Sequence, residues 1–489
     1  MSVQIFLEGK LLGIDEFLLA RTAAGGDPDH VFLGRSHWIS LLSEVLPRAL
    51  LAELGLAKIL LGSSGGGQFL LVLPEESRAD AERFLEAAAA EIAALSAEAL
   101  KLIWSITENL GDWSDVRRRL HEGLDRRRGA PAGAGGADLF QAPPAAISPE
   151  TEAYFADELG AKLRSSETAG WWPETPGKIA LGAGKHTWAL TNITDAIPFA
   201  RHAAPSDDSF GPASATELAA RASGLATWGV LRGDVDNVGI RVRRSQTIEE
   251  HIQLSVMYKQ FFAGELEVLC SMPEFWKKVT VIYTGGDDFA VYGAWDALIG
   301  LAGELERLFH RFAEQNLKDF AGPEGKTISM ALALAPAVDA SLGAVFEEAG
   351  ARLEAAKSAD KDCIWLLGRT LEWKQFAEAA ALKDSLVRMV EEYGCSPQYL
   401  KDLCGIYRET QSRMSRKQAR KMGGERPWRY HRRIGRILSA SRVRRGRQRR
   451  GDYQKARTAL IADLIGRSAV TVKLRPAGRV ALEWARLSV

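Results

Sequence analysis

The stretch VTVIYTGGDDFAVYGAW, residues 279–295, places two adjacent aspartates on a Gly-Gly turn between two apolar runs of strand-forming residues. Carboxylates this close repel, and one of them stays protonated unless a cation neutralises the pair. The glycines allow a positive φ and let another group approach the backbone. Asp287 and Asp288 therefore indicate a metal site that faces a polyphosphate. A plain type I′ hairpin with solvated aspartates explains the four letters equally well.

The turn belongs to a pattern of elements that occurs twice in the chain. Before residue 127, apolar periodicity predicts the order β-α-β-β-α-β-α, and the same order returns after residue 222. The two copies are offset by roughly 220 residues, which indicates an internal repeat. Each copy fits a ferredoxin-like β-α-β-β-α-β sheet with helices on one face. The predicted fold class is therefore α+β.

The hairpin turns of the two copies differ in their chemistry. The first copy reads LLGSSGGGQFLLVLP (60–74) and the second reads VIYTGGDDFAVYG (281–293). The first keeps the glycines, but it has Gly67-Gln68 where the second has Asp287-Asp288. We therefore expect the second copy to be chemically active and the first to be silent.

A third aspartate is expected beside this turn. The predicted strand TWGVLRG (227–233) ends in Asp-Val-Asp-Asn, and in such a sheet the first strand lies beside a hairpin strand. Asp234 would then approach Asp287 and Asp288 and form an oxygen site for Mg²⁺ or Mn²⁺. An Asx-turn at the strand end explains these residues taken alone. Their position opposite the Gly-Gly-Asp-Asp turn favours the metal site.

Two lysines follow near the end of the second copy. Lys357 and Lys361 have the i, i+4 spacing that places side chains on one face of a helix. They precede the predicted strand CIWLLG (363–368) and are candidates for holding a triphosphate. A solvated lysine face is an equally good interpretation.

Composition limits the class of protein. Of 489 residues 46% are hydrophobic, the net charge is +1, and no uninterrupted apolar run reaches the length of a membrane span. The N-terminus lacks the pattern of a signal peptide. The four cysteines form no CxxC pair, which argues against a disulfide scaffold and suits a reducing compartment. We expect a cytoplasmic protein that does not enter the membrane.

Positive charge is concentrated in residues 411–450, which hold 16 Lys or Arg and one acid, Glu425. Interleaved aromatic residues and this charge are typical of a surface that contacts a nucleic-acid backbone. Arg444, Arg445, Arg449 and Arg450 are the candidate contacts to RNA or to a complex. A solvated basic helix face is the alternative.

Several segments resemble a known family. The turn at 285–288, GVLRGDVDNVG (229–239) and AKSADKDCIWLLGRTLEW (356–373) strongly resemble the palm-polymerase large subunit of type III CRISPR effector complexes. GRSHWISLLSEVLPRALLAELGL (34–56) and GSSGGGQFLLVLP (62–74) resemble the first palm of that family.

The resemblance implies two ferredoxin-like palm domains of the nucleotidyl-cyclase kind and a helical C-terminal domain. The expected parts are a degenerate first palm (1–126), a Gly/Ala/Pro linker (127–150), an inter-palm region (151–222), a second palm (223–376) and a basic helical domain (377–489).

The family pattern implies an enzyme that makes cyclic oligoadenylate from ATP and releases pyrophosphate when target RNA is bound. It would work with guide RNA, target RNA and other effector subunits in a ribonucleoprotein. Asp234, Asp287 and Asp288 would be catalytic metal ligands. Gly285 and Gly286 would let the triphosphate approach, while Lys357 and Lys361 would contact phosphate. These roles are carried over from the resemblance alone.

Two departures from the family pattern matter. No histidine is followed by aspartate, so we expect no HD nuclease domain and no DNA cleavage. The stretch 170–190, at the place of the family's zinc ribbon, contains no cysteine, so we expect no zinc. Trp171 and Trp172 are expected to pack the loop that zinc otherwise holds.

Two other readings remain open. A diguanylate cyclase has glutamate after the first acid of its turn, where this chain has Asp288. A non-catalytic scaffold subunit with an inactive palm is the other alternative.

Overall fold

The computed structural model describes residues 3–22, 27–129, 147–191, 196–207, 211–414, 427–440, 447–465 and 476–489. The chain forms two compact units. The first consists of Met1–Arg221, Thr227–Ile328 and Leu334–Ala351, and the second of Ala222–Ala226, Ser329–Ala333 and Arg352–Val489. Both of the predicted hairpins lie in the first unit. Most of the predicted linker, 127–150, lies outside the described residues, and the domain boundaries stay predictions.

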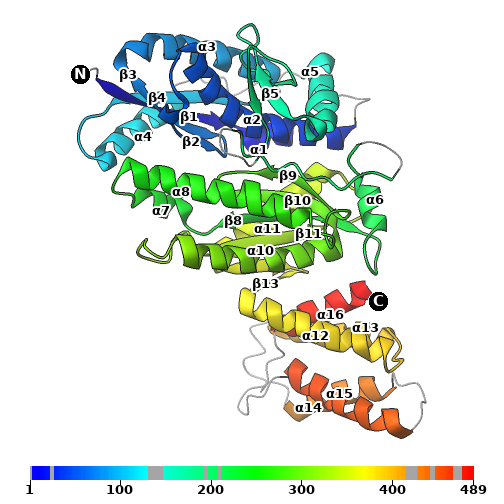
Figure 1. Ribbon diagram of the computed structural model, residues 1–489. Helices are drawn as coiled ribbons and strands as arrows, with labels where there is room; N and C mark the ends of the chain where they lie inside the picture. The colour runs from blue at the N-terminus through cyan, green and yellow to red at the C-terminus, as the bar shows by residue number, and fades with distance from the viewer. Residues whose placement is uncertain are drawn as a thin grey trace. The chain divides into compact units, whose positions relative to one another are not determined.

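The first palm is a four-stranded antiparallel sheet with long helices (Figure 1). Its strands run in the order β2-β3-β1-β4. Their bounds are Gln4–Leu12 for β1, Leu61–Gly65 for β2, Gln68–Pro74 for β3 and Lys101–Glu108 for β4. The helices are α1 (Ile14–Leu18), α2 (Pro28–Glu53), α3 (Arg78–Leu95) and α4 (Trp113–Gly129), with short 3₁₀ turns η1 (Lys58–Leu60) and η2 (Glu75–Ser77).

Helix α2 begins earlier than the apolar pattern alone indicates. The Asp27 carboxylate accepts hydrogen bonds from the backbone of Asp29 and His30, and Pro28 occupies the first helical position, where its missing N–H costs nothing. The helix continues through Pro47 to Glu53. It is buried along most of its length, so it acts as a central helix rather than as a surface one.

The second palm repeats this topology. Its four strands run β11-β8-β10-β9, the same relative order as β4-β1-β3-β2, and two more strands, β12 and β13, continue the sheet beyond β11. The strands are β8 (Trp228–Val235), β9 (Val279–Thr284), β10 (Asp288–Ala294), β11 (Ile328–Leu334), β12 (Cys363–Leu366) and β13 (Arg369–Glu372). The helices are α8 (Ile248–Gln260), η5 (Phe261–Glu265), α9 (Leu266–Cys270), α10 (Trp295–Asn316) and α11 (Leu342–Ala359). The predicted α+β class and the internal repeat are confirmed.

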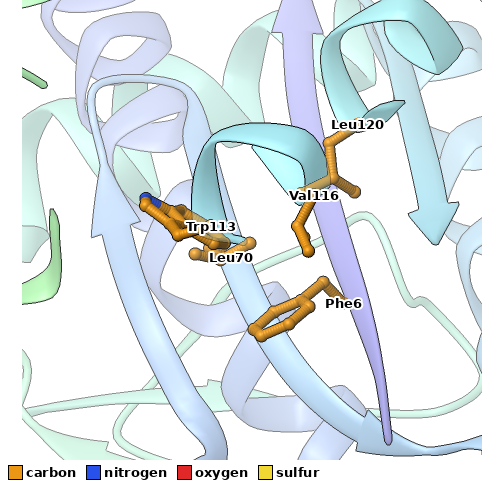
Figure 2. Packing of buried hydrophobic residues seen from close by; sticks show 5 residues of the cluster. All are labelled: Phe6, Leu70, Trp113, Val116 and Leu120. Atoms are coloured by element: carbon orange, nitrogen blue, oxygen red, sulfur yellow. The ribbon is translucent and has the colours of Figure 1, made fainter. Parts of the chain in front are cut away.

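Buried side chains of the first palm also meet the second. Figure 2 shows Trp113, Val116 and Leu120 of α4 packed over strand residues Phe6 and Leu70. The partly buried Ile248, from the start of α8 in the second palm, packs against the same cluster. The two palms therefore share apolar surface as well as topology.

The inter-palm region contains a small sheet held by aromatic packing. The elements of the inter-palm region are α5 (Pro149–Ala153), η3 (Tyr154–Lys162), η4 (Leu163–Ser165), β5 (Thr168–Trp171), β6 (Ala180–Leu181), β7 (His186–Ala189) and α6 (Ala215–Ala220). The sheet consists of β6, β5 and β7. The Trp171 ring stacks on Phe84 with 5.3 Å between centroids, and its indole N–H donates to the Pro176 carbonyl. The expectation for Trp171 holds, but the expectation for Trp172 is wrong, since Trp172 is 43% exposed.

The C-terminal part is helical, as predicted. Its helices are α12 (Trp373–Glu391), α13 (Gln398–Met414), α14 (Pro427–Ala440), α15 (Arg447–Ile465) and α16 (Pro476–Ser488). Arg444 and Arg445 lie outside the described residues, while Arg449 and Arg450 fall in the first turn of α15. In the described part of the chain, every helix is too short or too polar to cross a bilayer.

A buried ion pair joins the two palms beside their hairpins. Lys259 Nζ on α8 lies 2.5 Å from Glu44 Oε1 on α2, and both side chains are at most 12% exposed. Arg48 Nη1 lies 2.7 Å from Glu44 Oε2, and the Ser64 hydroxyl donates to the same oxygen. Glu44 therefore neutralises two cations, and these lower its pKa against the opposing effect of burial.

Removing the acid from this cluster should cost more than removing either cation. Glu44→Gln leaves Arg48 and Lys259 buried together without a counter-charge, and breaking a buried pair this way costs about 3–5 kcal/mol. Lys259→Met leaves Glu44 paired with Arg48, so we expect a smaller loss. Adding Lys259→Met to Glu44→Gln should recover part of the stability. Thermal and urea unfolding of the four proteins measures these differences.

The exposed pair between Arg307 and Glu304 provides the control, because Arg307→Met should cost less than about 1 kcal/mol. If Glu44→Gln unfolds like wild type, the cluster is solvated in solution and does not hold the palms.

Candidate functional site

Strand register brings Asp234 and Asp288 together. Asp234, near the end of β8, pairs directly across the antiparallel ladder with Asp288, the first residue of β10. The backbone N–H of Val235 donates to the Asp287 carbonyl at 3.0 Å, which ties the turn to the same strand end. The structure therefore brings Asp234 and Asp288 together, as the sequence analysis expected, and places Asp287 in the adjoining turn. Their role as metal ligands stays a prediction.

The Asp288 carboxylate is held on two sides. The Tyr283 hydroxyl donates to its Oδ2 at 2.9 Å, and a Cβ on Gly285 would lie 1.8 Å from its Oδ1. Gly285 thus leaves room for this carboxylate in addition to its predicted role toward a triphosphate. Burial, and then the negative charge of Asp234, raise the pKa of Asp288 to about 6.

The type I′ interpretation of the turn is wrong. Gly285 and Asp288 flank the turn, since the Gly285 N–H donates to the Asp288 carbonyl. A type I′ turn needs positive φ at both central residues, but neither Gly286 nor Asp287 has one. Positive φ is found instead in the first copy, at Gly65, Gly66 and Gly67. The two hairpins therefore use their glycines differently: the hairpin of the first copy uses them for backbone conformation, and the hairpin of the second copy uses Gly285 for space.

The carboxylate pair fits a divalent cation by its chemistry. Hard cations prefer carboxylate oxygens, and a cation would remove the like-charge repulsion that raises the Asp288 pKa. Among the described residues, no group of three or more His, Cys, Asp and Glu side chains is already arranged as a metal site. Asp234 and Asp288 are therefore a preformed pair, and the Asp287 side chain would have to complete it.

Asp236, two residues after Asp234, has a structural role instead. It is 1% exposed, its Oδ2 accepts a hydrogen bond from the Thr327 hydroxyl, and its backbone carbonyl accepts one from Gly325. Asn237 stands at the N-cap position of α7 (Val238–Arg243) with a positive φ of 61°, but its side chain makes no capping hydrogen bond. The second half of the Asp-Val-Asp-Asn motif is thus structural, while Asp234 remains the candidate site residue.

The aspartates open into a cavity of about 650 Å³ between the palms. The two glycine turns face each other there, since a Cβ on Gly66 would lie 3.3 Å from the Gly286 nitrogen. The volume is within the range of ligand pockets, roughly 300–1,000 Å³. The second palm contributes Asp234, Val238, Gly239, Val242, Arg243, His251, Ser255, Tyr258, Gly286, Asp287 and Asp288.

The first palm lines the opposite wall with polar and cationic groups. Those that the sequence analysis did not single out are Glu8, Ser63, Ser64, Trp113, Ser114, Arg117, Arg118 and His121. Trp113 Nε1 and His251 Nδ1 are buried and make no hydrogen bond to the described part of the protein. Arg117 spans the palms by donating to the Val242 carbonyl at 2.7 Å. No local motif marks these residues, because only the packing of one palm on the other brings them together.

The predicted lysines differ from their expected placement. Helix α11 ends at Ala359, so Lys357 is helical but Lys361 lies in the following turn, and the two do not share a helix face. The segment 359–362 reads Ala-Asp-Lys-Asp, and Asp362 adopts a positive φ of 59°, which takes the backbone out of the helical conformation. Both lysines belong to the second compact unit, and their contact with phosphate stays a prediction.

Comparison with known proteins identifies the second palm. Residues 227–365 match the family model described as Cas10/Cmr2, second palm domain. A curated relative from Mycobacterium tuberculosis, the CRISPR system single-strand-specific deoxyribonuclease Cas10/Csm1 (subtype III-A), is 35% identical over 121 residues. Its counterpart from Enterococcus italicus is 29% identical over 178 residues. These matches cover 21% and 35% of this chain, but only 15% and 22% of the relatives.

Solved structures share the fold over nearly the whole chain. The Csm1–Csm4 cassette in complex with pppApA aligns with a TM-score of 0.71 and 16% identity, covering 100% of this chain and 69% of that one. The cassette in complex with cA4 gives 0.70 and 17% identity, covering 99% and 70%.

The fold and the carboxylate pair define a protein with two palm domains, one of which carries the acids. The resemblance to the large subunit of type III CRISPR effector complexes is confirmed.

The Asp234–Asp288 pair should make the metal-free protein less stable at alkaline pH. Folding raises the pKa of Asp288 from its ordinary 3.8 to about 6, so the folded protein favours the neutral carboxyl. The stabilisation that this provides is fully present below pH 3.8 and is lost as the pH rises through about 6. Asp288→Asn keeps an oxygen for Tyr283 and removes one of the two charges. We expect the variant to melt a few degrees above wild type at pH 8, with a smaller gap at pH 5.

The matched control is Asp339→Asn, the same chemical change at an exposed position. It should leave the melting temperature unchanged at both pH values. If the melting temperature of Asp288→Asn lies below that of wild type at pH 8, the two carboxylates do not repel each other.

Proposed function

We propose that this chain is the large subunit of a type III CRISPR effector and joins ATP into cyclic oligoadenylate. The observation that carries the proposal is the direct pairing of Asp234 with Asp288 on the wall of a cavity lined by both palms. The whole activity is a proposal, because the matched segments cover less than a quarter of the curated relatives. The bound nucleotides of the Csm1–Csm4 structures belong to those proteins and support the choice of ATP.

In the proposed reaction, the 3′-hydroxyl of one ATP attacks the α-phosphorus of another. A phosphodiester bond forms, the bond to the β-phosphate oxygen breaks, pyrophosphate leaves with the electron pair, and the hydroxyl proton passes to solvent. Repetition elongates the chain, and attack by its terminal 3′-hydroxyl on its own 5′ α-phosphorus closes the ring with release of a further pyrophosphate. A divalent cation bound by the aspartates would supply positive charge for hydroxyl activation and for the leaving pyrophosphate.

The residues of this chain contribute binding and orientation. Asp234, Asp287 and Asp288 would hold the cation, and Gly286, which has open space around it, would let a phosphate approach the turn. The first-palm wall supplies the cations Arg117 and Arg118 and contains no acid at its own hairpin. The first palm would thus bind nucleotide without a catalytic metal.

The partners are proposed on the same basis. We propose guide RNA, target RNA and other effector subunits as partners, because the family resemblance implies them. The solved Csm1–Csm4 subcomplex shows an assembly with another subunit for the structurally similar protein. Contact of the basic segment with RNA, the absence of an HD nuclease and of zinc, and cytoplasmic location stay predictions.

Replacing a member of the carboxylate pair should abolish synthesis without disturbing assembly. Asp234→Asn in the purified complex with target RNA should reduce ATP consumption by more than about 100-fold, or about 2.7 kcal/mol in activation free energy. Chromatography of products from ATP, and separately from GTP, distinguishes this function from the alternatives. Consumption of GTP alone would favour a diguanylate cyclase, and no consumption of either by wild type would favour a scaffold.

The first palm should tolerate the loss of its hairpin side chain. Gln68 is exposed at the turn and lines the cavity. Gln68→Ala should slow ATP turnover by less than about tenfold, or about 1.4 kcal/mol, because it removes no metal ligand. A loss as large as that of Asp234→Asn would mean that the first palm also carries out chemistry.

A further inference from the structure

A short chain of hydrogen bonds leads from Asp288 to two residues that are not among those lining the cavity. Arg232 hydrogen-bonds to the Tyr283 hydroxyl, which in turn donates to Asp288 Oδ2 at 2.9 Å. The register explains why they meet. Ala290 of β10 pairs with Arg232 of β8 on one side and with Tyr283 of β9 on the other, so all three strands present these side chains on the same face as Asp288.

Neither Tyr283 nor Arg232 lines the cavity. We therefore expect their effect on the site to pass through Asp288, whose carboxylate accepts the Tyr283 hydroxyl. The hydroxyl fixes Oδ2, and Oδ1 lies against Gly285, where a side chain would collide with it. The carboxylate is thus held in one orientation by groups that do not belong to the cavity wall.

Arg232 is itself fixed by α11. Its guanidinium lies over the Phe346 ring, 4.1 Å from the centroid, and Gly350 leaves it room, because a Cβ there would lie 2.3 Å from Nη1. Stacking of this kind orients a planar guanidinium as well as stabilising it.

The same aromatic ring contacts the first palm. Phe346 meets Phe32 of α2 edge to face, with 5.1 Å between centroids, and it also contacts the Tyr283 ring. One turn earlier, the Leu342 N–H donates to the Asp29 carboxylate at 3.0 Å. The first turns of α11 are therefore attached to the start of α2, and the contacts continue without a gap from Phe32 to Asp288.

We propose that Tyr283 and Arg232 are positioning residues that set the orientation of Asp288 for a divalent cation, and that Phe346 makes this orientation depend on the contact between the palms. The inference rests on the proposed function. Partners that orient a ligand from outside the coordination shell usually change metal affinity by about 10–100-fold.

The test measures Mn²⁺ binding to the full-length protein by calorimetry, without nucleotide. Tyr283→Phe keeps the ring and loses only the hydroxyl, so the dissociation constant should rise about 10–100-fold. Tyr292→Phe is the matched control, because Tyr292 is buried in the same sheet and its hydroxyl faces the Ala213 carbonyl instead. It should bind Mn²⁺ like wild type. Phe346→Leu should weaken binding in the same direction as Tyr283→Phe.

Arg232→Lys gives a second, independent measurement of Mn²⁺ affinity if Tyr283→Phe fails to fold. Lysine keeps the charge but cannot reproduce the planar guanidinium over Phe346, so Mn²⁺ affinity should fall while the melting temperature changes little. In turnover assays, both variants should need more Mg²⁺ for half-maximal rate and recover at saturating Mg²⁺.

The outcomes separate the two proposals. If Asp288→Asn loses Mn²⁺ binding while Tyr283→Phe and Arg232→Lys bind like wild type, the positioning role is overturned and the proposed function stands. Equal weakening in Tyr283→Phe and Tyr292→Phe also overturns it, because the effect would then be general. If Asp288→Asn binds Mn²⁺ as wild type does, the metal assignment of the proposed function fails.

Discussion

The arrangement of the two palms depends on a carboxylate that is buried among cations from both of them. Glu44 satisfies Arg48 on its own helix and Lys259 on the other palm, and Ser64, beside the glycine turn, donates to it as well. Burial of these charges is costly, and good geometry with several hydrogen bonds compensates it. Because this geometry exists only when the palms are docked, it selects one register, and that register brings Gly66 opposite Gly286.

A second constraint acts inside the second palm. An antiparallel ladder places Asp234 directly beside Asp288, where two like charges are unfavourable. The surrounding sheet forces the pair together, and Tyr283 stabilises the ionised form of Asp288 only partly. Repulsion between charges that a well-packed scaffold holds together is typical of sites that bind a ligand.

Much of this could be predicted from local sequence patterns. Apolar periodicity located the strands and helices of both palms, because it depends only on residues that are close in sequence. The Gly-Gly-Asp-Asp turn together with Asp234 located the carboxylate pair, because these residues are paired on adjacent strands of one sheet. The failures have physical reasons. Asp236 belongs to the same Asp-Val-Asp-Asn motif as Asp234, yet its hydrogen bond with Thr327, which is far away in sequence, gives it a structural role. Tyr283 and Lys259 look like an ordinary strand residue and an ordinary helix residue until the sheet and the palms are assembled.

The small sheet that follows the first palm is held by different forces from a thiolate–metal cluster. The Trp171 ring stacks with both Phe84 and His186, and the Trp38 indole donates to the Gly177 carbonyl nearby. Thiolate–zinc clusters fail under acid, oxidants or chelators, since each attacks the ligands or the ion. Aromatic packing contains no metal for a chelator to remove and no thiolate to oxidise, and it weakens on cooling, as apolar association does. This region should therefore respond to temperature and to cosolvents rather than to redox state.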